Sequence, residues 1–555
     1  MKLSARDLPL PKMLGGENDY SFIEERLADT GLSDGIDTFV PRHSLSIVIC
    51  VLDRADLLRL GLASLSRQII RGGKFEIVVV DDGSGPEVKR VCEESNLSML
   101  RYVRREPTPQ FTESAARNEG IRASRNDIII QLDPEIVFPS EFALSWILRW
   151  FEVGLDVAVT VPRLYIRSRN VCLQDVLSGN IPISETGESD LREPLFADPT
   201  LMKHRHMPFM EMLGFCMAYR REAALAVGGW AEDWTDYGGA DQEFAYRLYQ
   251  SGAYCVYERN AVALHLEHPV AEKSGSHKTF LAERIPAYRA HRYQGPAIPR
   301  ARVPRVSIFM PAYNVGKYID DALNSARNQT YEDLEICVCD DGSSDDTAER
   351  ISKHAKEDSR IRWIQTEHVG CAAASNAATG IARGEFLLQL DADDVLFPEA
   401  AQAMVAEFDR RSWVGLVFAN LIRTDDQLRP IAPGYVFKRY RRFQMLMCMP
   451  VTAPRMWRKR AHSLVGGWNT DLSSAVDYDL FLRLSERVPF YHLDRVLYYY
   501  RHRTGSLSTE REEQFGNARI AVELSLNRMG LGEDFKVASS QEYDSLWYEF
   551  ERATS

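Results

Sequence analysis

An internal repeat constrains the fold of this chain more than any other feature of its sequence. Three segments of the first half return, in the same order, in the second half. The matched positions are Ser46 and Ser307, Asp81 and Asp340, and Asp133 and Asp391. Because their offsets of 261, 259 and 258 residues are nearly constant, the sequence predicts two homologous domains.

The repeat continues through each copy at a smaller offset. The later matched positions are Val227 and Val465, Asp241 and Asp477, and His265 and His502. These offsets are 238, 236 and 237 residues, so the first copy has about twenty extra residues before this part. The polar stretch 170–203 is where we expect them.

Prolines and composition set the expected domain boundaries. Residues 293–305 contain three prolines and one glycine, which do not form a regular element. Residues 510–530 carry one helical pattern, and the residues after them are polar. We expect a leader over 1–43, a first domain over 44–292, a linker over 293–305, a second domain over 306–530 and a tail over 531–555.

Within each copy, short apolar runs alternate with helical segments. Residues 78–80 and 128–130 are apolar runs typical of strands buried on both faces, and helices are expected over 53–66 and 316–328. This alternation predicts an α/β fold, with a mostly parallel, Rossmann-like, doubly wound sheet in each domain. Such sheets bind ligands at the carboxyl ends of their strands, where the acidic motifs of both copies fall.

Charge, apolar segments and cysteines exclude several classes of protein. Lys and Arg number 67 against 79 Asp and Glu, a net charge of −12, so we expect no nucleic-acid partner. No apolar run reaches the ~18 residues of a membrane span, and the first residues do not resemble a secretory signal. Nine dispersed cysteines without a CxxC pair are typical of reduced thiols. We expect a cytoplasmic protein, at most peripheral to the cytoplasmic face of the membrane through partners.

The sequence Asp-Asp-Gly-Ser follows a predicted buried strand in both copies. Asp81 and Asp82 in the first copy, and Asp340 and Asp341 in the second, can accept hydrogen bonds from a nucleotide base or ribose. Asp-Gly is also a common turn sequence, so one such motif fits a purely structural turn equally well. Its recurrence at the same place in both copies favours a binding role.

A second acidic motif ends the third predicted strand. Asp391 and Asp393 form a D-x-D sequence, and Asp133 and Glu135 keep two carboxylates at the same spacing. Neighbouring carboxylates repel one another unless a cation is present, and oxygen ligands suit Mg²⁺ or Mn²⁺. The structural alternative is an acidic, solvated loop.

A histidine follows a late strand in each copy, at His265 and at His502. A lone histidine is more often structural than a metal ligand. Two histidines at matched positions, each in a domain with paired carboxylates, favour the metal, because imidazole together with carboxylate suits Mn²⁺.

An aspartate opens a late helical segment in each copy, at Asp241 and at Asp477. The helix dipole favours a carboxylate at this place, and a capping aspartate is the structural alternative. Beside a metal site, such a carboxylate can act as a general base on a hydroxyl group.

Together these motifs resemble those of the family 2 glycosyltransferases, which have the GT-A fold. Residues 237–248 and 475–486 are similar to the two modules of the bacterial chondroitin and hyaluronan synthases, which are capsular glycosaminoglycan polymerases. The resemblance covers roughly residues 44 to 530. It also rests on Ser-Ile-Phe-Met-Pro-Ala-Tyr-Asn at 307–314, both Asp-Asp-Gly-Ser sequences, the D-x-D sequence, Val-Asp-Tyr-Asp at 476–479 and His502.

The resemblance implies a bifunctional, inverting, metal-dependent transferase that moves sugars from UDP-sugars to a growing surface or capsular glycan. It implies an N-acetylhexosamine for the first module, a hexuronate for the second, and an oligosaccharide or lipid-linked acceptor. By the same resemblance, Asp241 and Asp477 are the bases, and Mn²⁺ or Mg²⁺ is held by Glu135, His265, Asp393 and His502. The implied contacts to the nucleotide-sugar are Asp53, Asp81, Asp82, Asp133, Pro311, Tyr313, Asp340, Asp341 and Asp391.

The first copy departs from the family pattern at four positions. These are Cys50 for proline, Asp53 for asparagine, Glu135 for aspartate and Ala240 for an acidic residue. One alternative is therefore a single active module, the second, beside a degenerate first module that binds glycan. Another is a nucleotidyltransferase on a similar sheet, although no glycine-rich basic phosphate loop lies near either first strand.

Overall fold

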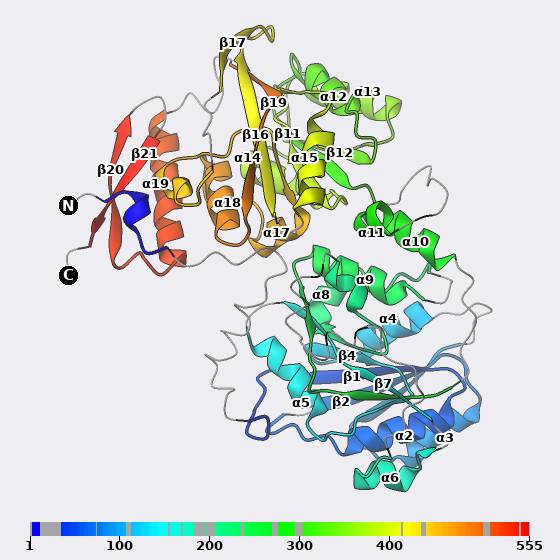
Figure 1. The fold of residues 1–555 in the computed structure, drawn as a ribbon. Helices are drawn as coiled ribbons and strands as arrows, with labels where there is room; N and C mark the ends of the chain where they lie inside the picture. The colour runs from blue at the N-terminus through cyan, green and yellow to red at the C-terminus, as the bar shows by residue number, and fades with distance from the viewer. Residues whose placement is uncertain are drawn as a thin grey trace. The chain divides into compact units, whose positions relative to one another are not determined.

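A computed structural model shows two compact units, residues 18–300 and residues 1–17 together with 301–555 (Figure 1). We call them the N-terminal module and the C-terminal module, and we describe each by itself. The structure describes residues 3–10, 35–73, 75–106, 113–153, 156–167, 170–182, 192, 195, 202, 205, 207–234, 238–268, 276–292, 294, 303–411, 414–434, 440–502, 511–542 and 546–553.

The main sheet of the N-terminal module is mostly parallel. In the described residues its order is β3 (Leu100–Arg104), β2 (Phe75–Asp81), β1 (Leu45–Val51), β4 (Ile128–Leu132), β8 (Cys216–Arg220), β6 (Val157–Thr160) and β9 (Tyr254–Tyr257). The first four strands are parallel neighbours, and β8 runs antiparallel between β4 and β6. The predicted fold class is confirmed, and the antiparallel strand is an addition that the sequence pattern did not indicate.

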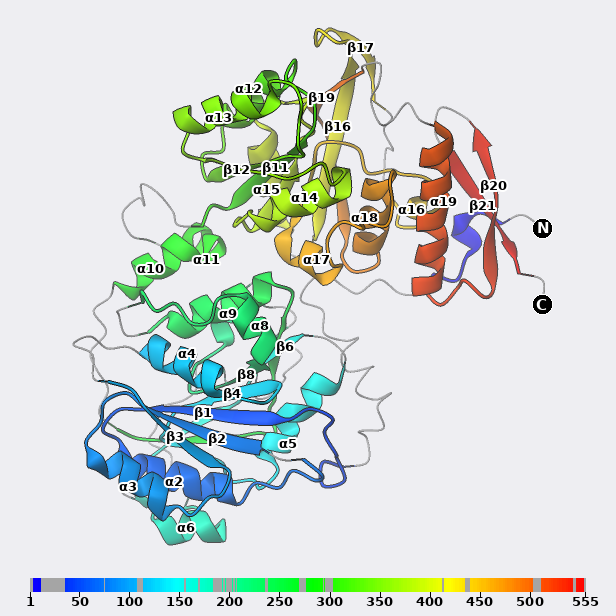
Figure 2. The ribbon, with the colours of Figure 1, turned by 180° about the vertical axis from the view of Figure 1, so that it is seen from behind.

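Helices cover both faces of this sheet. α2 (Ala55–Ser66) and α3 (Pro86–Glu94) lie on one face, and α4 (Glu113–Ala123), α8 (Arg221–Ala226) and α9 (Ala240–Gln250) lie on the other (Figure 2). Side chains of β4 are therefore buried on both sides, which explains its uninterrupted apolar sequence. The remaining described helices are α5 (Ala143–Leu148), η3 (Arg149–Val153), α6 (Leu173–Ser178), η6 (Pro208–Glu211), α10 (His277–Arg284) and α11 (Pro286–His291).

A small second sheet brings two predicted site residues together. Its strands are β5 (Ile136–Val137), β10 (Ala263–Leu266) and β7 (Arg163–Ile166), with β10 in the middle. In the antiparallel register of β5 and β10, His265 lies opposite Ile136. The late histidine therefore stands one residue from Glu135, although the two are far apart in the sequence.

The C-terminal module repeats the order and the directions of the strands. The matching strands are β13 (Ile361–Gln365), β12 (Leu334–Asp340), β11 (Val306–Ala312), β14 (Phe386–Gln389), β18 (Arg455–Arg458), β16 (Leu416–Thr424) and β19 (Phe490–Arg501). Here β18 is the antiparallel strand. The other edge of β19 pairs with β15 (Val395–Leu396) at Tyr498 and Tyr499, so one long strand combines the places of β9 and β10. β17 (Pro430–Pro433) pairs with β16.

The helices of the C-terminal module again lie between the strands. In the described residues they are α12 (Ile319–Arg327), α13 (Thr347–Glu357), α14 (Cys371–Gly380), α15 (Ala400–Arg410), α16 (Gln444–Met447), α17 (Lys459–Leu464), α18 (Val476–Ser485) and α19 (Arg511–Arg528). Across the described parts of both modules, we find no helix with the length and apolar character that a membrane span requires.

The extra residues of the first copy fall between β6 and β8. Val159 pairs with Ala218, and Val417 pairs with Met456 in the same register of the other module. The offset between the two copies is thus 258 residues at Val159 and Val417, on β6 and β16, but only 238 residues at Ala218 and Met456, on β8 and β18. Most of the predicted segment 170–203 lies outside the described residues.

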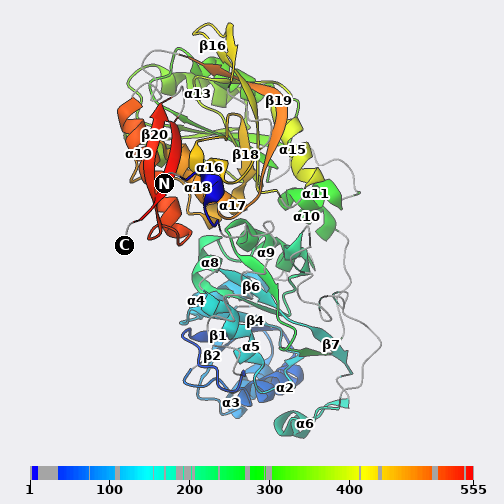
Figure 3. The same cartoon turned by 60° about the vertical axis from the view of Figure 1, so that its left-hand side comes forward.

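Both ends of the chain belong to the C-terminal module. The expected polar tail is instead a β-hairpin, β20 (Phe535–Glu542) and β21 (Leu546–Arg552), which lies beside α19 (Figure 3). The buried side chains Phe535, Val537, Tyr548 and Phe550 fall at every second position, as expected for strands with one buried face. Because other residues separate them, the segment looked polar in the sequence. Leu3 exchanges backbone hydrogen bonds of 2.7 and 2.9 Å with Phe550, and η1 (Ala5–Asp7) follows it. Residues 3–10 therefore pack with the C-terminal module.

Candidate active sites

Both modules place acidic residues at one edge of the main sheet. β2 ends at Asp81 and β12 ends at Asp340, while Asp133 and Asp391 follow β4 and β14. Since these strands lie parallel on either side of β1 or β11, their carboxyl ends meet at the same edge. The predicted acidic motifs are neighbours in space in each module.

A residue with left-handed backbone fixes the loop after the first strand. Asp53 and Asn314 have φ angles of 52° and 50°, which aspartate and asparagine tolerate better than most residues. Their side-chain oxygens accept hydrogen bonds from the backbone N–H of Gly85 at 3.0 Å and of Ser344 at 2.8 Å. Both side chains hold the Asp-Asp-Gly-Ser loop, so aspartate in place of the family's asparagine keeps this contact.

In the N-terminal module, Asp81 is saturated by donors of the protein. It is fully buried, and its Oδ2 accepts hydrogen bonds from the Tyr102 hydroxyl and, at 2.6 Å, from Nη1 of Arg104. Its Oδ1 accepts from the backbone N–H groups of Ser84 at 2.7 Å and Gly83 at 3.2 Å. Burial alone would raise the pKa of Asp81, but these hydrogen bonds outweigh it and hold the pKa below its usual range.

The second aspartate of this pair also has a cationic partner. Asp82 forms an ion pair with Arg105, the residue that directly follows β3. Both carboxylates of the N-terminal motif are therefore paired with guanidinium groups that come from the end of β3.

In the C-terminal module, the matching carboxylate keeps one oxygen available. Asp340 is fully buried, and its Oδ2 accepts a hydrogen bond from Nε2 of Gln365 at 2.8 Å. Its Oδ1 has no hydrogen-bond partner among the described residues. In the strand registers, Gln365 lies opposite Asp340 as Arg104 lies opposite Asp81. An unpartnered buried acceptor costs free energy, so this oxygen is poised to accept a donor from a ligand.

Asp341 is held by residues 366–370, the loop that follows β13. Its Oδ1 accepts hydrogen bonds from the backbone N–H of Val369 at 2.8 Å and the Thr366 hydroxyl at 3.0 Å. Its Oδ2 accepts from the backbone N–H of Gly370 at 2.9 Å and lies 3.1 Å from Nδ1 of His368. Because a carboxylate accepts about four hydrogen bonds, Asp341 shapes this loop rather than offering a free acceptor.

An exposed aromatic pair lies beside the same loop. The rings of Tyr313 and His368 stack with their centroids 4.0 Å apart and their planes 19° apart. Tyr313 is 43% exposed and directly follows β11, which also contains Pro311. The N-terminal module has Leu52 at this place, so it offers no ring there.

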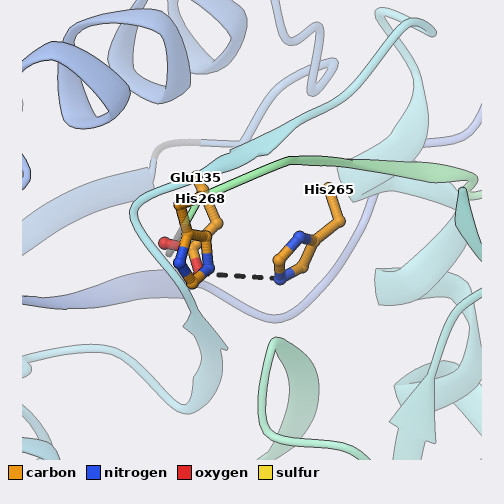
Figure 4. Close-up of side chains that lie close together, drawn as sticks. All are labelled: Glu135, His265 and His268. Atoms are coloured by element: carbon orange, nitrogen blue, oxygen red, sulfur yellow. Dashed lines mark ion pairs between the residues drawn. The ribbon is translucent and has the colours of Figure 1, made fainter. Parts of the chain in front are cut away.

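The acidic strand end of the N-terminal module meets two histidines. Oε1 of Glu135 lies 2.7 Å from Nε2 of His268 and 3.5 Å from Nε2 of His265. One ligand atom from each residue lies within 4.8 Å of the others, and Figure 4 shows the three side chains together. One carboxylate with two imidazoles is a donor set that suits Mn²⁺ and similar cations.

The protonation states of this cluster fit a cation. Burial alone would raise the pKa of Glu135, but His268, Arg54 and His265 lower it to about 2, so the carboxylate is ionised. Burial lowers the pKa of His265 to about 4, which leaves the neutral imidazole that binds metals. Burial and the charge of Glu135 raise the pKa of Asp133. Nη1 of Arg54 lies 3.0 Å from both oxygens of Glu135, so a cation held here would share or displace this contact.

The D-x-D sequence of the C-terminal module meets the end of β19. The backbone N–H of Arg501 donates to Oδ1 of Asp394 at 2.7 Å, and its Nε donates to the carbonyl oxygen of Asp393 at 2.8 Å. His502 follows directly and is exposed. Burial and then the charges of Asp393 and Asp391 hold the pKa of Asp394 well above its usual range, and burial also raises the pKa of Asp391. A cation would relieve this crowding of carboxylates.

The helix-start aspartates are held by contacts from outside their own helices. Asp241 is the second residue of α9, and its Oδ2 accepts a hydrogen bond from the backbone N–H of Gly214 at 3.0 Å. Asp477 is the second residue of α18, and its Oδ2 lies 3.2 Å from Nη2 of Arg455. A capping role alone does not account for these contacts.

Several residues that contact the candidate carboxylates were missed by sequence analysis. His268 had a signal, because it lies three residues after His265 in the same short stretch. The arginines had none, since their pairing depends on which strands and helices become neighbours. They are Arg54, Arg104, Arg105, Arg117 and Arg455.

Two sheets of one topology, each with acidic strand ends and a carboxylate at a late helix start, define a tandem pair of GT-A transferase domains. The family model described as glycosyl transferase family 2 matches residues 46–228 and 307–464, once in each module. The chain belongs to glycosyl transferase family 2. The resemblance read from the sequence is therefore confirmed.

Two relatives match almost the whole chain. A chondroitin synthase of Escherichia coli is 32% identical over 550 residues, which are 95% of this chain and 79% of that protein. A hyaluronan synthase of Pasteurella multocida is 30% identical over 554 residues, which are 95% of this chain and 56% of that protein. The chain thus spans little more than half the length of the second relative.

A solved structure of S. aureus TarS 1-349 in complex with UDP-GlcNAc also matches. It is 23% identical, covers 40% of this chain and 67% of its own, and has a TM-score of 0.35.

Proposed function

We propose that the chain is a bifunctional, inverting glycosyltransferase that uses UDP-sugars and Mn²⁺ or Mg²⁺. In this proposal the N-terminal module adds an N-acetylhexosamine and the C-terminal module adds a hexuronate to a growing surface or capsular glycan. The duplicated site carries the proposal, because corresponding acidic strand ends, late histidines and helix-start aspartates recur in both modules. The similarity to chondroitin and hyaluronan synthases over 95% of the chain supports the class of glycan.

In the proposed reaction, Asp241 and Asp477 each take the proton of an acceptor hydroxyl. The hydroxyl oxygen attacks the anomeric carbon while the bond from that carbon to UDP breaks on the opposite face. One such displacement inverts the configuration, as in inverting glycosidases. The contacts from Gly214 and Arg455 orient the two carboxylates for this transfer.

The histidine and carboxylate clusters are the proposed metal sites. Glu135, His265 and His268 would hold the cation of the N-terminal module, and Asp393 with His502 that of the C-terminal module. When bound, the cation neutralises charge that develops on the leaving diphosphate. Asp133 and Asp391, two residues before the acidic ligands, would contact the ribose or a water of the cation.

The nucleotide is proposed to bind at the strand ends beside these sites. In the C-terminal module, Oδ1 of Asp340 would accept the N–H of uracil, and Tyr313 offers a ring for stacking. In the N-terminal module, Asp81 and Asp82 would act through Arg104 and Arg105. Asp53, Asp341 and Pro311 would shape the walls of the two pockets.

The acceptor in this proposal is an oligosaccharide or a lipid-linked glycan. The dispersed cysteines favour a reducing compartment. We therefore place the enzyme in the cytoplasm, where partners can bring it to the membrane surface.

Separate Asp241→Asn and Asp477→Asn variants test this function. Each is incubated with Mn²⁺, a short acceptor and one UDP-sugar at a time, and the products are resolved by mass. We expect D241N to lose the first addition and keep the second, and D477N to do the reverse. Wild-type rates of every addition in D241N would contradict the two-site proposal.

A single active C-terminal module is the second candidate. The arginines that pair with Asp81, Asp82 and Glu135 favour it, because they occupy carboxylates that would otherwise serve the donor. Loss of all additions in D477N alone would establish this candidate. Release of pyrophosphate in place of UDP would instead point to a nucleotidyltransferase.

A further inference from the structure

Each module buries one arginine between its strand-end aspartate and its helix-start aspartate, but the arginine comes from different elements. In the C-terminal module it is Arg455, on β18, and in the N-terminal module it is Arg117, on α4. Both side chains are less than a tenth exposed.

Arg455 links the two aspartates of the C-terminal module. Its Nη2 lies 3.2 Å from Oδ2 of Asp477, and its Nε donates to Oε1 of Gln389 at 3.1 Å. Nε2 of Gln389 in turn donates to Oδ1 of Asp391 at 2.9 Å. The guanidinium lies 4.9 Å from the centroid of the Phe481 ring. One continuous set of contacts thus joins the proposed base to the D-x-D sequence.

Arg117 lies between the matching elements of the N-terminal module, and it also forms an ion pair with Glu113 on its own helix. Its Nη2 lies 3.4 Å from Oδ1 of Asp133, and its guanidinium lies 4.2 Å from the centroid of the Trp230 ring. A Cβ atom on Gly214 would stand 2.9 Å from Nη2, so the glycine makes room for the arginine. Gly214 also donates its N–H to Asp241, which places Arg117 against the residue that holds the proposed base.

The strand register shows that the N-terminal module lacks the strand arginine. Gln389 lies opposite Arg455 in the β14–β18 pair, and Gln131 lies opposite Met217 in the β4–β8 pair. Met217 is therefore the counterpart of Arg455.

The helix register shows that the C-terminal module lacks the helix arginine. Asn118 on α4 and Asn376 on α14 each make the same two hydrogen bonds with the backbone of a tryptophan, Trp230 and Trp468, at 2.7 to 2.9 Å. The residues that precede these asparagines are Arg117 and Ser375.

Each module already contains a partner for an arginine at the other position. Oε1 of the buried Gln131 has no hydrogen-bond partner among the described residues, and Oε1 is the atom that Gln389 offers to Arg455. Trp468 supplies the ring that Trp230 offers to Arg117. The two modules therefore differ in the source of the arginine but keep these partners, while Glu113, which pairs with Arg117, is matched by Cys371 on α14.

We propose that Arg117 and Arg455 are positioning residues of the two sugar transfers, and that either element can supply the arginine. The proposal rests on the function proposed above. A buried guanidinium binds carboxylates with strong, directional hydrogen bonds. Arg455 binds the helix-start aspartate directly, whereas Arg117 binds the strand end and packs against Gly214, which holds Asp241. Since a displacement of about 1 Å can cost roughly 100-fold in rate, the arginine acts on kcat rather than on donor binding.

Single exchanges between the modules test the first half of the proposal. Arg455→Met gives the C-terminal module the residue of the N-terminal one, and we expect kcat of the second addition to fall about 100-fold with an unchanged KM for the donor. Arg117→Ser should do the same to the first addition. In each variant the addition by the other module is the internal control. Arg455→Lys, which keeps the charge without the fork, should give an intermediate kcat.

Relocation of the arginine tests the second half. The triple variant R455M/S375R/T452G moves it to α14, with glycine at 452 because Gly214 is the third residue before Met217 as Thr452 is before Arg455. We expect it to regain about tenfold in kcat over R455M, and R117S/M217R to regain as much over R117S. The matched control is T452G alone, which should resemble the wild type.

The outcomes distinguish the positioning proposal from the proposed function on which it rests. If D477N keeps the second addition, the proposed function fails whatever the arginines do. If D477N is inactive but folded R455M turns over like the wild type, the positioning proposal fails alone. Relocated variants no faster than the single exchanges would overturn the claim that either element serves. If R455M does not fold, the kcat values of Arg455→Lys, R117S and R117S/M217R test the positioning proposal by the same criteria.

Discussion

The two modules share one topology but balance their carboxylates differently. In the N-terminal module, arginines pair with the acidic residues of the strand ends: Arg104 with Asp81, Arg105 with Asp82 and Arg54 with Glu135. In the C-terminal module, neutral groups hold the corresponding pair: the Gln365 amide for Asp340, and the Thr366 hydroxyl with two backbone N–H groups for Asp341. At the same edge of the sheet, the carboxylates are therefore balanced by arginines of the protein in one module, and held by uncharged groups that leave their negative charge to a ligand in the other.

This difference gives the two modules different binding surfaces at the strand ends, although their folds are alike. Within the described part of the C-terminal module, Oδ1 of Asp340 is a buried acceptor without a partner and Tyr313 is an exposed ring, which together suit a base that donates an N–H and stacks. The N-terminal module presents guanidinium groups at the same place, which suit acceptor atoms of a ligand. Substitutions at matched positions test how far this contrast extends to function.

The largest effect is expected from Asp340→Asn. The amide removes the charged, unpartnered oxygen, and a hydrogen bond to a charged group contributes about 1.5–3 kcal/mol, so the KM for the donor of the second addition should rise about 100-fold. The matched variant Asp81→Asn should leave the KM of the first addition almost unchanged and lower the melting temperature, because the protein itself saturates Asp81. Equal rises of KM in both variants would break the comparison.

The next effect is expected at the metal cluster. His268→Ala removes the imidazole nearest to Glu135, and loss of such a group should raise the Mn²⁺ concentration that half-activates the first addition by roughly 10- to 50-fold. The second addition should keep its Mn²⁺ dependence. Glu267→Ala, on the exposed residue between the two histidines, is the control. An unchanged Mn²⁺ titration in H268A would remove this residue from the proposed metal site.

The fold was predictable because the repeat and the buried strands leave a direct mark in the sequence. Ile128 to Ile130 read as a parallel strand, since both faces are covered and polar residues have no place there. The hairpin at 535–552 was not predictable in this way, because its buried residues Phe535, Val537, Tyr548 and Phe550 alternate with other residues and form no continuous apolar run. The contact between Leu3 and Phe550 joins the two ends of the chain, which no local pattern encodes.

The site was predictable only as far as residue types and spacings reach. The strand-end aspartates and His265 follow from motifs, and the register of β5 and β10 explains why His265 meets Glu135. The roles of the arginines depend on contacts across the sheet, which motifs and spacings do not reveal. A comparison of the two repeats does not reveal them either. Arg117 and Arg455 have no counterpart in the other copy, so a search for matched residues passes over both.

A smaller effect is expected from the aromatic pair. Tyr313→Leu gives the C-terminal module the residue that the N-terminal module has at this place. Stacking of a base on an aromatic ring contributes about 1–3 kcal/mol, and leucine keeps part of the apolar contact, so the KM for the donor of the second addition should rise only about fivefold. Leu52→Tyr in the other module is the reverse test. A KM in Y313L as high as in D340N would show that the ring, and not the buried oxygen, dominates the contrast.

The smallest effect concerns stability and pH. Hydrogen bonds hold the pKa of Asp81 below its unfolded value of 3.8, so they stabilise the folded chain above that pH, and the contribution is lost as the pH falls through the folded pKa. Arg104→Gln, which copies Gln365, removes one of these bonds while those from Tyr102 and Ser84 remain. By calorimetry, we expect the melting temperature of R104Q to lie slightly below that of the wild type at pH 6. The two melting temperatures should converge as the pH is lowered into the acid range. A difference that persists unchanged below the folded pKa would show that Arg104 stabilises the module by packing rather than through the charge of Asp81.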